Sequence, residues 1–138
     1  VYCNEQAYIL ILPSQQDVID AQVNLEKIWA LAKEFSRSTT LSASDSLDVV
    51  ITSQSTTYDF VSRYFAPHKG MNEDPVTGSM HTGLAPLWAE KLNKTEMLAF
   101  QASKRGGELY CKILENDRIE IAGYAKLVAD RLENGTEV

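Results

Sequence analysis

The chain has 138 residues, of which 44% are hydrophobic, and its 13 Lys and Arg against 19 Asp and Glu give a formal charge of −6. This length and apolar content predict one globular domain with a substantial core. Because no basic run interrupts the acidic balance, a nucleic-acid or anionic-membrane partner is disfavoured, and we expect a small-molecule ligand.

The longest strongly apolar run, Ala7 to Leu12, is too short to span a bilayer, and no charged-then-apolar leader opens the sequence. We therefore predict a cytoplasmic protein without a membrane partner. Cys3 and Cys111 lie far apart and show no metal-binding spacing, so reduced thiols are expected rather than a disulfide or a metal site. Val1 stands where a start methionine would, which suggests a piece of a longer protein.

The first elements are a strand and a helix. Residues 7–12 predict a buried strand that ends at Pro13. The next helix is capped by Asn24, and its apolar residues recur at three- and four-residue spacing, so we expect it to cover a sheet with one stripe. The stripe consists of Leu25, Ile28, Trp29, Leu31, Ala32 and Phe35.

A loop and two strands follow. Ser36 to Ser46 is rich in Ser and Thr and has no period, so it predicts a loop with at most a short edge strand. Leu47 to Ser53 has the β-branched content of a strand. Tyr58 to Ala66 places aromatic residues on both of its faces, which indicates a strand covered on each side.

The second half of the chain predicts one helix and a run of strands. Thr82 to Leu92 has a helical pattern, and Pro86 should bend this helix because it removes a backbone donor. Residues 115–117 (END) predict the turn of a hairpin. The order predicts an α+β fold in which a curved sheet wraps around the helix that starts near Gly78. The strands expected here are Met97 to Ala102, Glu108 to Leu114 and Arg118 to Ile121, with Tyr124 to Val128 continuing the last.

The stretch Asn72 to His81, NEDPVTGSMH, precedes that helix and carries the chemistry. Pro75 biases Asp74 toward an extended conformation, and the N–H groups from Gly78 onward have no partner within the helix. With the positive end of the helix dipole these groups form a receptor for a carboxylate or another anion, to which the Ser79 hydroxyl adds a donor.

A ligand held there by its carboxylate would present its neighbouring carbon to Asp74, which suggests proton transfer. Glu73 and His81 are further titratable groups. Side chains of adjacent residues in an extended segment diverge, so Glu73 should not share the role of Asp74. The residue types alone leave two alternatives open: a capping turn without chemistry, and a structural His81.

Five segments carry a likeness to a known family: SRYFAP (62–67), EDPVTGS with His81 (73–81), LW (87–88), QASKRGGEL (101–109) and DRIEIAGYAKLV (117–128). In order and spacing they resemble the C-terminal half of the PhzF-like proteins, the phenazine-biosynthesis isomerase family. The clear similarity runs from about Asp59 to Val128, and residues 1–58 agree only in general layout.

The resemblance implies the diaminopimelate epimerase fold, in which two lobes each wrap a mixed sheet around a central helix and the active site lies between them. Residues 1–138 would be the C-terminal lobe: a mixed, mostly antiparallel curved sheet around the helix, with additional N-terminal helices outside. The N-terminal lobe, which supplies a glutamate acid/base in the family, would be absent. The implied reaction is a cofactor-free isomerisation that moves a proton on a small carboxylated metabolite.

The resemblance also implies roles for individual residues. Asp74 and Ser79 match the functional aspartate and serine of the family. Met80 departs from the usual small residue, so the cleft would be narrower or differently lined, and Arg105 could attract an anionic substrate or be merely solvated or ion-paired. The substrate contacts implied in this way are Glu73, Thr77, Gly78, Met80, His81 and Arg105.

Two other functions stay open. Epimerases of this fold use one cysteine at each helix entrance, whereas Thr77-Gly78-Ser79 contains no thiol, and a serine pKa is far too high to replace a thiolate base. A non-catalytic lobe that serves binding or assembly would use Asp74 only as a cap. An isolated lobe should be inactive, and it should pair with a second copy through its exposed apolar surface.

Overall fold

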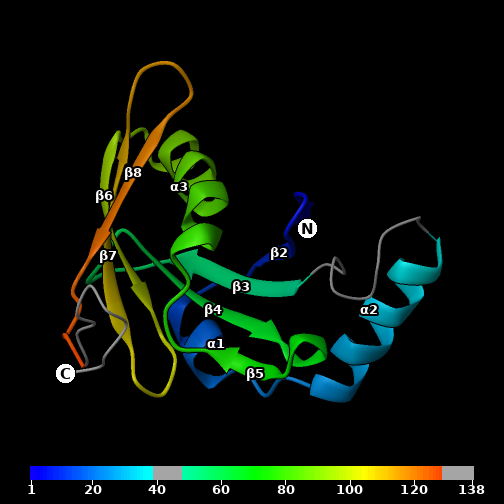
Figure 1. Ribbon diagram of the computed structural model, residues 1–138. Coiled ribbons are helices and arrows are strands. Elements are labelled where there is room, and N and C mark those ends of the chain that lie inside the picture. Colours follow the sequence, from blue (N-terminus) through cyan, green and yellow to red (C-terminus); the bar gives the residue numbers. More distant parts are fainter. Residues whose placement is uncertain (39–47, 129–138) are drawn as a thin grey trace, which may run out of the picture.

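The structure is a computed structural model that describes residues 1–38 and 48–128 (Figure 1). Its helices are α1 (Gln15–Asp20), α2 (Leu25–Ser38), the short 3₁₀ helix η2 (Pro67–Lys69) and α3 (Gly78–Leu92). Its strands are β1 (Tyr2–Cys3), β2 (Ala7–Ile11), β3 (Asp48–Gln54), β4 (Phe60–Ala66), β5 (Met71–Asp74), β6 (Glu96–Gln101), β7 (Gly107–Ile113) and β8 (Ile119–Gly123).

The eight described strands form one mixed sheet in the order β1-β2-β3-β4-β6-β7-β8, and β5 pairs with β4 beside this path. The pairs β2–β3 and β4–β6 are parallel, and the other pairs are antiparallel. Each parallel pair is joined by a helical crossover: α1 and α2 lie between β2 and β3, and α3 lies between β4 and β6. The expected α+β fold with a mostly antiparallel sheet is confirmed.

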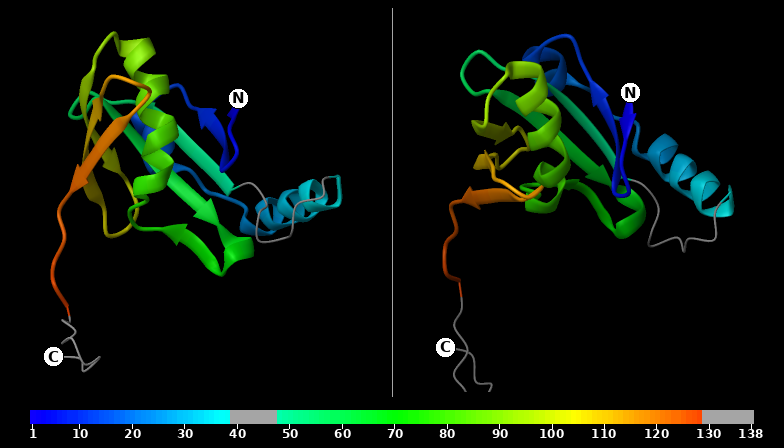
Figure 2. Two further views of the ribbon diagram at one scale, coloured as in Figure 1. Left: turned by 45° about the horizontal axis from the view of Figure 1, so that its top comes forward. Right: turned by 90° about the horizontal axis from the view of Figure 1, so that it is seen from above.

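The sheet curves around α3, with β6, β7 and β8 on one side of the helix and β3 and β4 running below it (Figures 1 and 2). Side chains alternate between two cores along each strand. Phe60 and Tyr64 of β4 pack with Leu84 and Trp88 on the α3 face. Phe65 packs on the opposite face, against the core that contains Val18 of α1 and Ile28 of α2. The prediction that this strand is covered on both sides is therefore correct.

Helix α2 covers less of the sheet than its stripe predicted. Asn24 caps it as expected, because its Oδ1 accepts a hydrogen bond from the Lys27 N–H at 2.9 Å. Ile28 and Ala32 are buried, but Trp29 and Leu31 keep 43% and 39% of their surface exposed. The side chain of Phe35 lies outside the described residues. The helix extends to Ser38, so the loop expected from Ser36 begins later, and its short edge strand falls in residues 39–47, outside the described part.

Helix α3 begins at Gly78, as expected of the helix start, and so includes one turn more than the helical pattern read from Thr82. The first turn, Gly78 to His81, does not show the helical spacing of apolar residues, although its backbone is helical. Pro86 lies inside the helix at an exposed position, as the sequence placed it, and supplies no N–H to the carbonyl of Thr82. Asn93 ends the helix in the left-handed region, with φ of 54°.

Two strand predictions were wrong. Met71–Asp74 forms β5, which pairs with β4 across an irregular register and was not expected as a strand. Tyr124 to Val128 does not continue β8, whose last pair joins Gly123 to Leu109. Because β8 is an edge strand and β7 begins at Gly107, little ladder remains for residues beyond Gly123.

The predicted hairpin turn is confirmed between β7 and β8. Asn116 and Asp117 both have positive φ, as a tight hairpin turn requires, and the Leu114 N–H donates to the Arg118 carbonyl at 2.8 Å. Cys3 is exposed and Cys111 is buried, and both are free thiols, as predicted. None of the described helices is both long and apolar enough to cross a bilayer.

Candidate functional site: the start of helix α3

The first turn of α3 has no side-chain cap from the described part of the chain. Thr77 occupies the N-cap position, but its hydroxyl donates to Asp74 Oδ2 at 2.5 Å instead of accepting from the helix. Within the described residues, no side chain accepts from the N–H of Gly78 or Ser79, and the first turn contains no acidic residue. A Cβ placed on Gly78 would meet no atom within 4 Å, so this backbone faces open space. The turn can therefore receive an anion.

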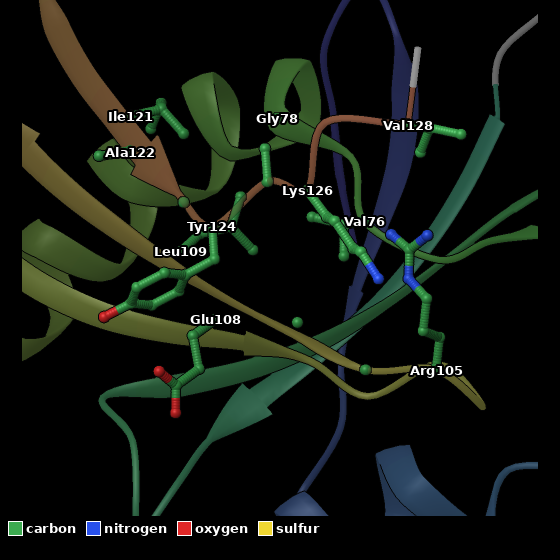
Figure 3. Close-up of a pocket in the computed structure, with 14 residues that line it drawn as sticks. Val76, Gly78, Arg105, Glu108, Leu109, Ile121, Ala122, Tyr124, Lys126 and Val128 are labelled. Carbon is green, nitrogen blue, oxygen red and sulfur yellow. The ribbon is translucent and has the colours of Figure 1, made fainter.

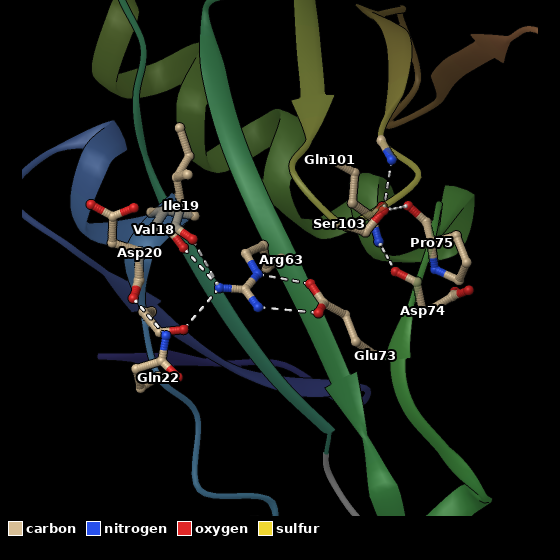
Figure 4. A network of polar contacts seen from close by, with 12 residues as sticks. Val18, Ile19, Asp20, Gln22, Arg63, Glu73, Asp74, Pro75, Gln101 and Ser103 are labelled. Carbon is tan, nitrogen blue, oxygen red and sulfur yellow. Dashed lines mark hydrogen bonds and ion pairs between the residues drawn. The ribbon is translucent and has the colours of Figure 1, made fainter.

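A buried glutamine holds the segment before the helix in place. The Gln101 side chain is fully buried; its Oε1 accepts from the Thr77 N–H at 2.7 Å and its Nε2 donates to the Asp74 carbonyl at 2.8 Å. The same Nε2 lies 3.1 Å from Thr77 Oγ1. Figure 4 shows Gln101 and Ser103 reaching across to Asp74 and Pro75, whose carbonyl accepts from Ser103 Oγ at 2.8 Å. Gln101 was not predicted as a site residue.

A cavity of about 700 Å³ lies beside this helix start. It is bounded by Val76 and Gly78, by residues 105–109 and by residues 121–126 and 128 (Figure 3). Arg105 and Lys126 line it as cations and Glu108 as an anion. The predicted residues Gly78 and Arg105 thus lie at one cavity, whereas the predicted Asp74 and Ser79 are not among the residues that line it.

Ser79 and Thr77 differ in what they can offer a ligand. Ser79 is exposed, and its Oγ accepts a hydrogen bond from Gln6 Nε2 at 3.0 Å. Thr77 is 8% exposed, and its hydroxyl and its N–H are both bonded within the chain. Thr77 is therefore suited to positioning Asp74, and Ser79 is suited to meeting a ligand.

Met80 and His81 lie in the core and do not face the cavity. Met80 is 2% exposed and packs with the α3-face core. His81 is fully buried, stacks on Phe60 with 5.9 Å between ring centroids, and places Nδ1 2.8 Å from the Thr77 carbonyl. Burial lowers the pKa of His81, so the ring is neutral and Nδ1–H donates to that carbonyl. The packing corrects both expectations of substrate contact and favours the structural histidine.

Glu73 and Asp74 diverge, as the extended segment predicted. Both carboxylate oxygens of Glu73 contact Arg63, at 2.7 Å to Nε and 3.1 Å to Nη2 (Figure 4). Arg63 Nη1 also donates to the carbonyls of Val18, Ile19 and Ala21 at the end of α1. Glu73 is therefore occupied on the α1 face of the sheet, which argues against the substrate contact expected of it.

A second polar cluster, not predicted from the sequence, joins the sheet to Ser79. Asp48 at the start of β3 is fully buried and accepts from the Tyr64 hydroxyl. Lys69 Nζ and His68 Nε2 each lie 2.9 Å from one of its oxygens. Burial raises the pKa of Asp48, and the contacts with Lys69 and His68 oppose this rise. The only sequence signal was an acidic residue at the edge of a β-branched run.

The fold and the helix start define a class: a curved mixed sheet around one helix whose uncapped N-terminus opens beside a cavity. The family model for "Phenazine biosynthesis-like protein" (PhzC-PhzF) matches residues 2–131. The chain therefore belongs to the PhzC/PhzF family, and the likeness extends into the first 58 residues as well.

Similar proteins include uncharacterized isomerases of Pseudomonas aeruginosa, 56% identical over 81 residues, and of Halalkalibacterium halodurans, 56% identical over 86 residues. These matches cover 59% and 61% of this chain but 31% and 32% of the relatives. A phenazine biosynthesis-like domain-containing protein of Homo sapiens is 49% identical over 77 residues, covering 56% of this chain and 27% of the relative. The matched part thus spans about a third of the length of these curated relatives.

Two crystal structures of family members share the fold. A PhzC/PhzF protein of Clostridium difficile is 39% identical with a TM-score of 0.68, covering 85% of this chain and 42% of that chain. A PhzF family protein of Enterococcus faecalis is 32% identical with a TM-score of 0.67 and the same coverages.

Proposed function

We propose that this chain forms one wall of the active site of a cofactor-independent PhzF-like isomerase that moves a proton on a small carboxylated substrate. The observation that supports this most is the uncapped N-terminus of α3, which opens beside a cavity at Gly78. The second acid/base group would come from the part of the relatives that this chain does not match. The proposed active site therefore lies in a cleft between two lobes.

The helix start would hold the substrate carboxylate. The N–H groups of Gly78 and Ser79 point away from the helix, and an anion near a helix N-terminus gains about 0.3–1 kcal/mol from the dipole at an exposed site. The Ser79 hydroxyl would add one donor. Arg105 and Lys126 line the same cavity and would favour an anion over a neutral ligand.

Asp74 would assist the proton transfer. The Thr77 hydroxyl donates to its Oδ2 and Gln101 Nε2 donates to its backbone carbonyl, so one neighbour holds the carboxylate and a second holds the backbone of the same residue. Its Oδ1 has no hydrogen bond within the described residues and can meet a substrate proton. Proton transfer requires such a group within hydrogen-bond reach of the reacting carbon, and the bound carboxylate would set that distance.

The two-thiol epimerase is a weaker candidate. Ser79 stands at the helix entrance where such a mechanism needs a thiolate, and Cys3 is exposed on a different element. Cys111 is buried in the α3-face core, and burial raises the pKa of its thiol to about 11. A thiol of that pKa carries almost no thiolate near neutral pH.

A titration of the chain with benzoate tests the anion receptor. We expect the backbone amide resonances of Gly78 and Ser79 to shift with benzoate and to stay in place with neutral benzamide. The Gly78→Ala variant should bind benzoate more weakly, because its Cβ fills the open space, while its folding is unimpaired because Ala favours a helix. Equal responses to both probes would argue for a non-catalytic lobe.

The parent protein tests the chemistry. The Asp74→Asn variant keeps the shape of the side chain but removes its basicity, so a full-length parent with this change should lose exchange of substrate hydrogen with solvent deuterium. Benzoate should still bind to this variant. Normal turnover in Asp74→Asn would refute the acid/base role, whereas loss of both binding and turnover would point to a folding defect.

Pairing with a second copy is part of the same proposal. Tyr124, Leu127 and Val128 expose 82%, 77% and 92% of their surface and follow the edge strand β8. Exposed apolar side chains of this kind favour association of the chain. Sedimentation of the chain should show a dimer that dissociates on dilution, and a strict monomer at high concentration would remove this part of the proposal.

A further inference from the structure

An unbroken series of side-chain contacts runs from the interior of the sheet to the helix start. Asp48 and Tyr64 form its buried end, and Gln6, between β1 and β2, connects them to Ser79. Asp48, Tyr64 and Gln6, which lead to Ser79 in this series, were not predicted as site residues. They come from β3, β4 and the turn before β2, and Gln6 and Ser79 are 73 positions apart in the sequence.

The buried end determines which atoms donate. An ionised carboxylate can only accept hydrogen bonds, and Asp48 is flanked by Lys69 Nζ and His68 Nε2, each at 2.9 Å. The Tyr64 hydroxyl must therefore donate its hydrogen to Asp48. Its oxygen then remains free to accept a hydrogen bond from a further donor.

Gln6 is that donor, and the same nitrogen serves Ser79. Gln6 Nε2 lies 3.1 Å from the Tyr64 hydroxyl and 3.0 Å from Ser79 Oγ. The Gln6 backbone is fixed as well, because its N–H donates to Asn4 Oδ1 and its carbonyl accepts from the Asp48 N–H, each at 2.9 Å. The amide thus presents NH₂, and not its oxygen, to both hydroxyl groups.

The direction of these bonds has a consequence for Ser79. Since Ser79 Oγ accepts from Gln6, its own hydrogen cannot point back along the same contact. The residue is exposed, so this hydrogen is left available to an acceptor outside the chain. In the proposed complex it would join the free N–H groups of Gly78 and Ser79 as a donor to the ligand carboxylate.

We propose that Gln6 is a positioning residue that fixes the Ser79 hydroxyl as a hydrogen-bond donor to the carboxylate of the ligand, with Tyr64 and Asp48 setting the direction. This inference rests on the proposed function, because it assumes an anion at the start of α3. It adds a specificity device: the site would prefer an ionised carboxylate, which accepts, over a ligand group that has to donate to Ser79.

A double-mutant cycle with benzoate as the probe tests the coupling. Gln6→Met keeps the length of the side chain and removes the donor, and Ser79→Ala removes the hydroxyl. Each variant should weaken benzoate binding about fivefold, the typical effect of one lost hydrogen bond, and the double variant should be no weaker than Ser79→Ala alone. Gln22→Met is the matched control at an exposed glutamine and should bind benzoate normally.

The Tyr64→Phe variant tests whether Tyr64 sets the direction of the Gln6–Ser79 hydrogen bond. It leaves Gln6 next to Ser79 but removes the hydroxyl that links Gln6 to Asp48, so the Gln6 amide can turn its oxygen toward Ser79. We expect a smaller loss of affinity than in Gln6→Met. Wild-type affinity in Tyr64→Phe would overturn the assigned direction, and independent, multiplying losses in the double variant would overturn the positioning role.

A readout without ligand distinguishes this inference from the proposed function. The side-chain NH₂ resonances of Gln6 should shift in Ser79→Ala and stay unchanged in Gln22→Met. If benzoate fails to bind the unchanged chain, the anion receptor is refuted, and the Gln6 resonances still decide whether Gln6 donates to Ser79. Gln6 resonances that ignore Ser79→Ala would overturn the inference even when benzoate binds.

Discussion

Replacing Gln101 with Leu should destabilise the chain and loosen the segment that carries Asp74. Leu has nearly the same volume but no polar atom, so the change removes three hydrogen bonds, at 2.7, 2.8 and 3.1 Å, and little packing. The Thr77 N–H, in a residue that is 8% exposed, loses its acceptor, and the Asp74 carbonyl loses a donor. A buried unpaired donor costs about 1–3 kcal/mol and each of the two other lost bonds about 0.5–1.5 kcal/mol, which gives about 2–6 kcal/mol in all.

Urea unfolding of Gln101→Leu against the unchanged chain measures this loss. Gln16→Leu is the matched control: Gln16 is exposed, its Nε2 bonds Asp20 one turn on, and its loss should stay within about 0.5 kcal/mol. Gln101→Leu should also weaken the benzoate response at Gly78, because the turn before the helix is no longer fixed. A loss below about 1 kcal/mol would refute the reasoning, since it would mean that water or another group satisfies the Thr77 N–H as well as Gln101 does.

Three further predictions concern packing, reactivity and pH. Gly107→Ala would bring its Cβ into a clash with Val76 Cγ2. Because the β-branched Val side chain is stiff, the clash should lower the stability by about 1–3 kcal/mol in a thermal melt. An unchanged melting temperature would contradict the close approach. Ellman's reagent should modify the exposed Cys3 in the native chain and reach Cys111, whose pKa is raised to about 11, only after denaturation; two fast thiols would show that Cys111 is accessible. Because burial lowers the pKa of His81 in the folded chain, the unfolded chain takes up a proton at this ring first as the pH falls. The contribution of the neutral ring to the free energy of unfolding is therefore complete above about pH 6.5. It is lost below that pH by up to about 1.4 kcal/mol per pH unit. Urea unfolding between about pH 7.5 and about pH 5.5 should therefore show a steeper loss in the unchanged chain than in His81→Gln, and equal slopes would contradict the neutral buried ring.

The sequence predicted the elements whose signals are local. Alternating and β-branched residues identified β2, β3, β4 and β6, and the Asn24 cap and the Asn116 turn were visible because each needs only residues a few positions away. The start of α3 was predicted on the same grounds. Free N–H groups, Gly78 and the absence of an acidic residue in the first turn are properties of a few consecutive residues.

The pattern failed where partners are distant in the chain. Strand β5 has no apolar alternation and exists because β4 offers it an edge, whereas Tyr124 to Val128 alternates but finds little ladder beyond Gly123. Met80 and His81 follow the motif of the site, yet the curvature of the sheet around α3 turns both of them into the core. Side-chain direction in a helix depends on which face the sheet covers, and no local period specifies that.

The sequence by itself thus determined the family and predicted free N–H groups at Gly78 and Ser79, because capping and helix polarity follow from adjacent residues. The tertiary structure alone decided which side chains hold that helix start. Gln101 reaches Thr77 across 24 positions, and Gln6 reaches Ser79 across 73, and such contacts arise only when the sheet has closed around α3. A hydrogen bond depends on distance in space, and the order of residues along the chain does not fix that distance for side chains on separate strands.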